Sequence, residues 1–187
     1  MGTRDEILAA ARRIMRERGY ARATTKEIAR AAGYSEAALY KHFTDKTEIF
    51  LGVLSEQLPA FGTLLTALEA GTGTVRGNLT KVARTALDFY LEGFPISASL
   101  FSSRELLSAH RDAMRELGTG PRYPQRALSQ YLRAEQRLGR LPRASDAETI
   151  AALLLGACFQ QAFLLSFDGE PVADLNALAR RLVKTLL

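Results

Sequence analysis

One short stretch of the chain, GYSEAALYKHFTDK at residues 33–46, combines two tyrosines, one histidine and two lysines with few apolar residues. Only Ala38, Leu39 and Phe43 can anchor the short helix that this stretch predicts. A helix that buries so little and carries so many hydrogen-bonding and cationic groups is suited to bind something outside the protein. Hydroxyls and cations bind phosphates, whereas polar groups near a helix start reach base edges, so the chemistry indicated is nucleic-acid recognition.

The candidate residues divide by role. Hydroxyl, imidazole and ammonium groups are predicted to bind backbone phosphates, and Lys46 does so at a helix start, where the helix dipole also favours an anion. Residues at the start of the short helix are predicted to contact bases, because a carboxylate such as Glu36 accepts from a cytosine amine and the methyl of Ala37 can touch a thymine methyl. The predicted DNA-contact residues are Thr25, Tyr34, Ser35, Glu36, Ala37, Tyr40, Lys41, His42 and Lys46.

Three short helices must position these side chains. Thr3 with Glu6 predicts a capping box for a first helix over 4–18, and Thr24 with Glu27 predicts a second box for a helix over 25–32. Gly33 supplies a left-handed turn, and Ser35 caps a third helix that reaches about residue 42. A helix, a tight turn with glycine and a short helix form the layout of a helix-turn-helix.

The remainder of the chain is also predicted to be helical. Period-two alternation is absent, and we expect an all-α fold of about nine helices. A long fourth helix capped by Asp45 contains Pro59, which predicts a kink near residues 55–59. The later helices are predicted over 75–91, over 96–117 as one or two helices, over 124–138, from a Ser145–Glu148 capping box to 167, and over 172–187.

The charge distribution favours an anionic partner for the beginning of the chain. The 187 residues carry a net charge of +5. Residues 1–46 contain ten Lys/Arg against six Asp/Glu, or +4, whereas residues 47–187 contain fifteen against fourteen, or +1. The basic excess therefore coincides with the predicted helix-turn-helix.

The residue types argue against an enzyme. One cysteine, two histidines and no paired-carboxylate motif leave little catalytic material, and no metal-ligand spacing is present. We therefore expect no cofactor and no metal. Two rivals remain, a protein of the membrane surface and a nonspecific nucleic-acid binder; steep salt dependence without sequence preference would support the second.

One apolar stretch could be mistaken for a membrane span. Residues 150–167 carry no charge and approach the length of a spanning helix. However, Gln160 and Gln161 lie at its middle, and neither flank has a basic cluster. A helix buried on all sides of a soluble assembly gives the same pattern, and we favour that interpretation.

Residues from about Ile7 to Phe50 resemble the N-terminal domain of the TetR family of transcriptional regulators, in its AcrR-like form. The resemblance rests on an ordered set of residues: Thr24-Thr25, Ile28-Ala29, Ala32-Gly33, Ser35, Leu39-Tyr40, His42-Phe43, Lys46 and Ile49-Phe50. It implies a DNA-binding domain over 1–46, a ligand-binding and dimerisation domain over 47–187, and a cytoplasmic regulator. Such a regulator, here expected to be a repressor, binds a palindromic double-stranded DNA operator as a homodimer and is released by a small effector. Tyr34 and Glu36-Ala37 depart from the family pattern, which affects the operator sequence.

The resemblance also implies a dimer built from the last two helices of each subunit. Ala152 and Gly156 would permit close helix approach, and the predicted interface is Ala152, Gly156, Leu175, Leu178, Leu182 and Leu186. The alternative is that the apolar helix is the core axis of a monomer.

A small, largely apolar effector would need a lined cavity. The predicted lining is Phe61, Phe89, Phe94, Phe101, Tyr123, Tyr131, Phe159 and Phe163, although aromatic residues at helical spacing are also typical of plain core. A ligand that fits one tilt of the fourth helix would weaken operator binding by population shift.

Overall fold

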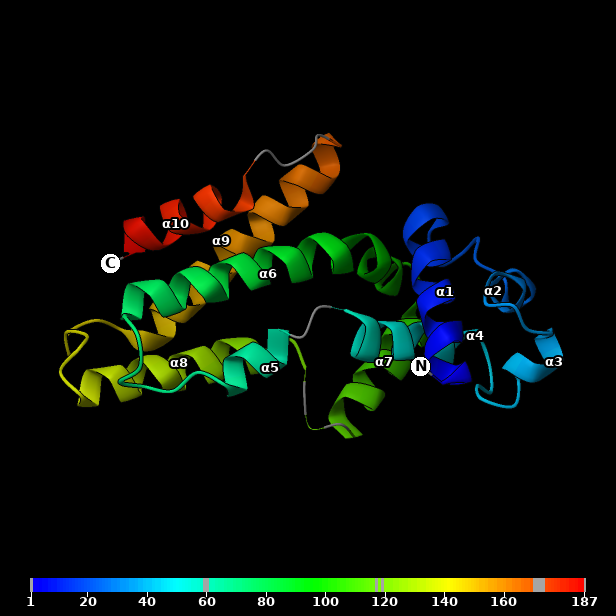
Figure 1. The fold of residues 1–187 in the computed structure, drawn as a ribbon, viewed down its shortest axis with the longest axis horizontal. Helices are drawn as coiled ribbons and strands as arrows, with labels where there is room; N and C mark the ends of the chain where they lie inside the picture. Colours follow the sequence, from blue (N-terminus) through cyan, green and yellow to red (C-terminus); the bar gives the residue numbers. More distant parts are fainter. Residues whose placement is uncertain (1, 59–60, 117, 119, 170–173, 187) are drawn as a thin grey trace. The chain divides into compact units, whose positions relative to one another are not determined.

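The computed structural model describes residues 2–58, 61–116, 118, 120–169 and 174–186 (Figure 1). Within these ranges the regular structure is entirely helical, which confirms the all-α prediction. A π-helical segment, η1, and a 3₁₀ segment, η2, interrupt ten α-helices. The elements are α1 (Thr3–Arg18), α2 (Thr25–Ala31), α3 (Glu36–Leu39), α4 (Lys46–Gly52), η1 (Val53–Gln57), α5 (Phe61–Thr66), α6 (Val75–Ser97), η2 (Ala98–Ser102), α7 (Arg104–Glu116), α8 (Tyr123–Arg137), α9 (Ala147–Asp168) and α10 (Leu175–Leu186).

The chain forms two compact units, and each is built from two separate stretches of sequence. The first unit is Met1–Leu58 with Glu92–Gly118, and the second is Pro59–Leu91 with Thr119–Leu187. Helix α6 therefore contributes its last residues to the first unit and the rest to the second. The predicted division of function after residue 46 stays a prediction.

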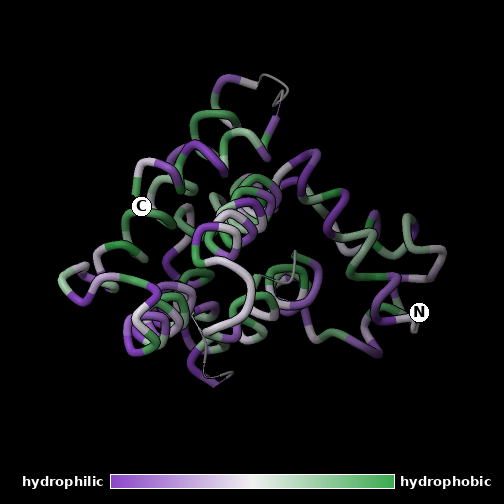
Figure 2. The backbone as a smooth tube through the Cα atoms, turned by 60° about the vertical axis from the view of Figure 1, so that its left-hand side comes forward, coloured by the Kyte–Doolittle hydropathy of each residue, from purple (hydrophilic) through white to green (hydrophobic). Residues whose placement is uncertain are grey.

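The core of the first unit lies between α1, the two short helices and α4. Ile7, Leu8 and Met15 on α1 are fully buried. Complete burial of one such side chain contributes about 1.5–3 kcal/mol. Gly52 on α4 allows the close approach, because a Cβ at this position would lie 2.8 Å from Leu8 Cδ2. These contacts fix the scaffold on which the short helices rest. The hydropathy colours along the tube alternate between green and purple within many helices, as expected of helices with one buried face (Figure 2).

Helix caps were predicted correctly around the short helices and incorrectly at two other places. The predicted caps at Thr24, Ser35 and Asp45 are all formed. The predicted box at Thr3 is wrong, because Thr3 is already helical and the N–H of Gly2 donates to the Asp5 carboxylate at 3.0 Å. The predicted cap at Ser145 is also wrong.

At the start of α9 the neighbouring residue Asp146 forms the cap instead. Its carboxylate accepts from the N–H groups of Glu148 and Thr149 at 3.0 and 3.3 Å. An ionised carboxylate at this position also interacts favourably with the helix dipole, which a serine hydroxyl cannot match.

The long fourth helix divides instead of kinking. It leaves the α form at Val53, continues as the π-helical segment η1 and ends at Leu58, whose backbone is extended. Extended backbone is what a residue before proline favours, because the proline ring clashes with an α-helical predecessor. Pro59, at the predicted kink, lies outside the described residues. A second helix, α5, begins at Phe61.

Helix α6 continues past the residues that were predicted to end it. Gly93 and Pro95 both lie inside the helix, which reaches Ser97. Gly93 has a packing reason, since a Cβ there would lie 3.1 Å from Leu58 Cδ1. Pro95 is close to the helix end, and Ile96 beyond it is fully buried in the core of the first unit. Burial of the last turn thus overrides the two helix-breaking residues.

Helix α9 is apolar around its circumference, but only one of its faces packs in the core of the second unit. Leu154, Cys158 and Ala162 are fully buried, whereas Leu153 and Phe167 are 56% and 79% exposed. By length and composition alone, Lys46–Thr66 and Ala147–Asp168 could cross a membrane. Neither stretch indicates a membrane protein by itself, because the core helix of a soluble protein passes the same test and the first stretch is broken at Leu58.

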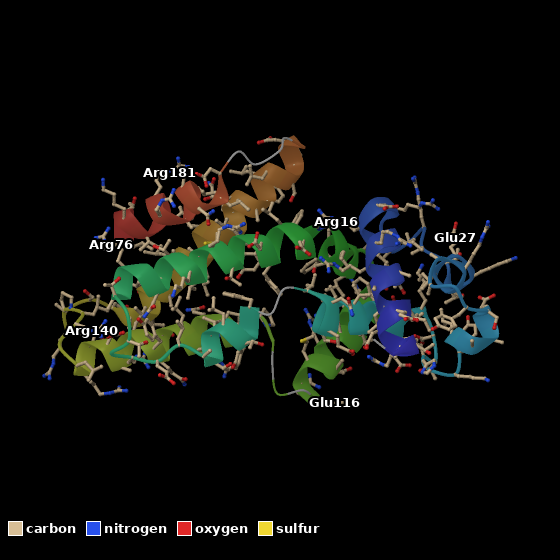
Figure 3. The ribbon with its side chains drawn as sticks, in the orientation of Figure 1. Arg16, Glu27, Arg76, Glu116, Arg140 and Arg181 are labelled. Atoms are coloured by element: carbon tan, nitrogen blue, oxygen red, sulfur yellow. The ribbon has the colours of Figure 1, made fainter. Side chains whose placement is uncertain are left out.

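A buried polar network pins the loop before α6. Glu135 on α8 is fully buried. Its Oε1 accepts from the N–H of Gly71 at 3.2 Å, and its Oε2 faces Arg140 Nε at 3.1 Å as an ion pair (Arg140 is labelled in Figure 3). Asn78 donates to Tyr131 Oη at 2.9 Å, and burial raises the pKa of Tyr131 to about 12. The buried Glu135 carboxylate therefore depends on Arg140 as its counter-charge, and loss of Arg140 would leave it buried without a cation.

Replacing Arg140 should consequently destabilise the protein strongly. We expect Arg140→Ala to lower the free energy of unfolding by about 3–5 kcal/mol, because it leaves the Glu135 carboxylate buried without its counter-charge. Urea denaturation followed by circular dichroism measures the change. Arg137→Ala, which replaces an exposed arginine at the end of α8, should cost less than about 0.5 kcal/mol. Equal effects of the two variants would contradict this account.

Candidate nucleic-acid interface

The turn between α2 and α3 has the geometry that the sequence predicted. Gly33 adopts a φ of 83°, a backbone angle that residues with a Cβ rarely adopt. The N–H of Tyr34 donates to the Ala29 carbonyl at 2.9 Å, which closes the end of α2. Ser35 Oγ then accepts from the N–H of Ala38 at 3.1 Å and starts α3. Leu39 and Phe43 are buried in the first unit and hold α3 down.

Most of the predicted contact residues on α3 and after it face solvent. Tyr40 is 50% exposed. Ser35, Ala37, Lys41 and His42 are exposed as well. Tyr34 differs, since it is half-buried and its hydroxyl donates to the carboxylate of Glu6 on α1. Tyr34 therefore anchors the start of α3 to α1 through its hydroxyl.

Thr25, Glu36 and Tyr40 form one chain of hydrogen bonds between α2 and α3. The Tyr40 hydroxyl donates to Thr25 Oγ1 at 3.2 Å, and the Thr25 hydroxyl donates to Glu36 Oε1 at 2.5 Å. Residues predicted to contact phosphate and a base are thus joined before any DNA is present. The carboxylate of Glu36 occupies the hydroxyl donor that a phosphate oxygen would take.

Lys46 is held over an aromatic ring. Its Nζ lies 4.2 Å from the ring centroid of Tyr20 and 3.4 Å from the Ala21 carbonyl oxygen. Burial lowers the pKa of Lys46 from its ordinary value. A cation on an aromatic face has a restricted position, so the ammonium is placed beside the α1–α2 turn before it meets an anion.

The basic excess of the first 46 residues is largely cancelled within the folded unit. Over the residues of the first unit, thirteen Lys/Arg stand against twelve Asp/Glu, or +1, and over the second unit twelve stand against eight, or +4. Acidic residues from the stretch 92–118 supply part of this compensation. Local placement of cations, more than net charge, must therefore attract DNA to the recognition surface.

The predicted effector-lining residues are brought together only in part. Four aromatic rings of the second unit form a continuous cluster, with Phe61 and Phe89 centroids 5.6 Å apart and Tyr90 and Phe159 centroids 5.4 Å apart. Phe61 and Tyr131 are buried, Phe101 is exposed, and Phe94 lies on the α6 stretch of the first unit. Two hollows on the first unit contain none of the predicted lining residues, which are Phe61, Phe89, Phe94, Phe101, Tyr123, Tyr131, Phe159 and Phe163.

The predicted interface residues divide between two surfaces. Ala152 and Gly156 are exposed on the outer face of α9. Leu178 on α10 is buried in the core of the second unit, and Leu175, Leu182 and Leu186 pack against that core. The apolar stripe of α10 therefore packs in its own subunit, because that side of the core would otherwise be uncovered.

Sequence reasoning missed two residues that shape the interface. Glu6 accepts the hydrogen bond of Tyr34, and Tyr20 supports Lys46. The two members of each pair are 28 and 26 positions apart in the sequence, so no local spacing pattern connects them. Only the packing of α1 on the short helices brings them into contact.

The fold and this surface define a protein with an N-terminal helix-turn-helix. The sequence profile described as "Bacterial regulatory proteins, tetR family" matches residues 7–53. This N-terminal region is therefore similar to the TetR family of bacterial regulatory proteins.

Curated relatives match mainly the N-terminal region, and solved structures share the fold over nearly the whole chain. The HTH-type transcriptional repressor AcnR of Corynebacterium efficiens is 41% identical over 30% of each chain. The repressor Rv1474c of Mycobacterium tuberculosis is 29% identical over 81% of this chain and 88% of its own. FadR of Bacillus subtilis, solved in complex with stearoyl-CoA, superposes with a TM-score of 0.72 at 18% identity, over 97% of this chain and 96% of its own. The match to AcnR spans only about 30% of that protein, so high identity is confined to the DNA-binding region.

The bond between Tyr34 and Glu6 predicts different roles for the two tyrosines that flank α3. Tyr34→Phe should lower the free energy of unfolding by about 1.5 kcal/mol, since a half-buried carboxylate loses a donor. Tyr40→Phe, which removes an exposed hydroxyl, should change stability by less than about 0.5 kcal/mol. Thermal and urea unfolding of both variants test this. A Tyr34→Phe variant as stable as the wild type would show that the bond contributes nothing.

Proposed function

We propose that this protein is a ligand-responsive transcriptional regulator, a repressor that binds a palindromic DNA operator as a homodimer and is released by a small, largely apolar effector. The single observation that carries the proposal is the recognition surface of α3, which is exposed, polar and held at the correct side of a helix-turn-helix by the Gly33 turn. The match of residues 7–53 to the TetR family and the similarity to two transcriptional repressors support this function.

The proposed docking places α3 in the major groove. The small side chains of Ala37 and Ser35 let the helix approach the bases, and Lys41 and His42 extend toward the groove walls. Thr25, Tyr40 and Lys46 bind the flanking phosphates. Glu36 then has two candidate roles, acceptance of a hydrogen bond from a base or retention of Thr25 in its free-state position.

The outer face of α9 supports dimerisation. Leu153, Phe163 and Leu164 are at least 41% exposed on a helix that carries no charge between Glu148 and Asp168. Gly156 sits on the same face, where a Cβ would contact nothing within 4 Å of this chain. A second copy of the helix would cover these side chains, and two paired subunits would present two recognition helices to two half-sites.

The aromatic cluster of the second unit is the proposed effector site. Its rings join α5, α6 and α9, and an apolar molecule could insert between them if they separate. The stearoyl-CoA complex of FadR is an example of ligand binding by a protein of the same fold. We further propose a cytoplasmic location and no catalytic activity.

Loss of a phosphate contact should weaken DNA binding regardless of sequence. We expect Lys46→Ala or Tyr40→Ala to reduce affinity for all operator variants alike, and Lys46→Ala to lower the slope of log affinity against log salt by about 0.9 for each half-site. Gel-shift titrations on DNA selected from a random pool measure this. Lys81→Ala, an exposed lysine on α6, serves as the control.

Exchange of Glu36 separates its two candidate roles. If Glu36 contacts a base, Glu36→Gln changes the preferred base at one defined position of each half-site. If it only holds Thr25, Glu36→Gln and Thr25→Val change affinity for every sequence without changing base preference. DNA retention unaffected by Lys46→Ala, Tyr40→Ala and Glu36→Gln would refute the proposed interface.

A charge on the outer face of α9 should separate the subunits. Leu153→Glu is expected to weaken self-association at least 100-fold, because an unpaired carboxylate would be buried in an apolar interface. Sedimentation velocity across a concentration series measures the change. Leu138→Glu, an equally exposed leucine on the same unit but off α9, should leave the dimer intact. A wild-type protein that sediments as a monomer would overturn the dimer proposal.

A further inference from the structure

A hollow on the first unit shares no residue with the recognition surface. Its volume is about 550 Å³, within the range of small-molecule sites. It is lined by one face of α1 and the end of η1, through Ala9, Arg12, Arg13, Arg16, Glu17 and Gln57. Arg16 is labelled on α1 in Figure 3. Three guanidinium groups and a carboxamide therefore line a shallow, open hollow that contains no aromatic residue.

The positive charge in this hollow is only partly balanced. Arg12 pairs with the carboxylate of Glu92 on α6, and both side chains are about one-third exposed. Arg13 and Arg16 are exposed and form no ion pair with any residue in the described part of the chain. Glu17, one turn after Arg13, is the only carboxylate in the lining.

The spacing of the arginines has an energetic cost. Arg12 and Arg16 are four residues apart on one helix, an arrangement in which like charges destabilise the helix by a few tenths of a kcal/mol. An anion placed between them would convert this repulsion into attraction. Guanidinium groups bind phosphate oxygens in pairs of parallel hydrogen bonds, and a phosphate with two or more charges matches three cations better than a single carboxylate does.

We propose that this hollow binds a small phosphorylated molecule that carries at least two negative charges. The site differs from the apolar effector site in the second unit in its residues, its polarity and its ligand class. Arg13 and Arg16 hold the phosphate groups, Gln57 donates from the opposite side, and Arg12 is shared between the ligand and Glu92.

Because Arg12 also pairs with Glu92, ligand binding to Arg12 would affect the contact between α1 and α6. Glu92 begins the stretch of α6 that packs in this unit, and Ile96 one turn later is fully buried there. A phosphate that draws Arg12 away from Glu92 weakens the tie between α1 and α6. Because α1 carries Glu6 and packs against both short helices, the ligand then alters DNA affinity, a consequence that rests on the proposed function.

Glu92 distinguishes this proposal from a face of arginines that is merely solvated. If Glu92 competes with the ligand for Arg12, its neutralisation strengthens ligand binding. If the arginines only keep α1 soluble, neutralisation of Glu92 should change anion affinity no more than neutralisation of any other surface carboxylate does.

The test is isothermal titration calorimetry with inorganic pyrophosphate at constant ionic strength. The wild-type protein should bind one pyrophosphate per chain, Arg13→Gln/Arg16→Gln should bind at least tenfold more weakly, and Glu92→Gln should bind about three- to fivefold more tightly. Arg22→Gln/Arg30→Gln removes the same charge from exposed arginines outside the hollow and should bind as the wild type does. Glu56→Gln, which removes a carboxylate paired with Arg4 elsewhere on the unit, controls for Glu92→Gln.

Three results would overturn the site. The first is unchanged binding by Arg13→Gln/Arg16→Gln, and the second is an equal gain in Glu92→Gln and Glu56→Gln. The third is an equal loss in Arg22→Gln/Arg30→Gln and Arg13→Gln/Arg16→Gln, which would show that the anion responds to positive charge in general and not to the hollow. In gel shifts at the same ionic strength, pyrophosphate should change DNA affinity of the wild type and not of Arg13→Gln/Arg16→Gln. A protein that binds pyrophosphate as expected but retains no DNA of any sequence would support the site and refute the proposed function.

Discussion

The packing of α1 is the constraint on which the recognition surface depends. One face of this helix is buried through Ile7, Leu8 and Met15, and the two short helices have too few apolar residues to form a core without it. A helix of four residues such as α3 has no stability of its own, because helix nucleation costs more than one turn returns. Three interactions stabilise α3 instead: the local cap at Ser35, the burial of Leu39, and the hydrogen bond from Tyr34 to Glu6.

The polar side of α1 has a second set of partners. Glu6 accepts a hydrogen bond from Tyr34, and Arg12 donates one to Glu92. A single helix therefore contacts both a residue just before α3 and the last part of α6 through charged side chains. Ion pairs that are one-third exposed contribute little to stability. The value of the Arg12–Glu92 pair lies in its position, since Arg12 can exchange Glu92 for a ligand or for solvent at small energetic cost.

Charge is distributed differently in the folded unit than along the sequence. The net charge of +4 over residues 1–46 is offset by −2 from residues 47–58 and −1 from residues 92–118, so the unit that holds the helix-turn-helix is nearly neutral. Attraction to DNA must then come from a few cations held in fixed places, of which Lys46 over Tyr20 is the clearest. Glu36, bound to Thr25, places a negative charge within the same surface.

Much of the fold followed from the sequence by itself, because the signals are local. The caps at Thr24, Ser35 and Asp45, the turn at Gly33 and the helical periodicity each depend on residues within one or two turns. The solvent-facing side of α3 was predictable for the same reason. Tertiary structure alone decided the rest. Burial of Ile96 extends α6 past Gly93 and Pro95. The apolar stripe of α10 packs against the core of the second unit. Helix α1 brings Glu6 to Tyr34 and holds three arginines beside one hollow. These outcomes depend on contacts between residues far apart in the chain. The free energy of such contacts exceeds the local helix propensities on which a prediction from sequence rests.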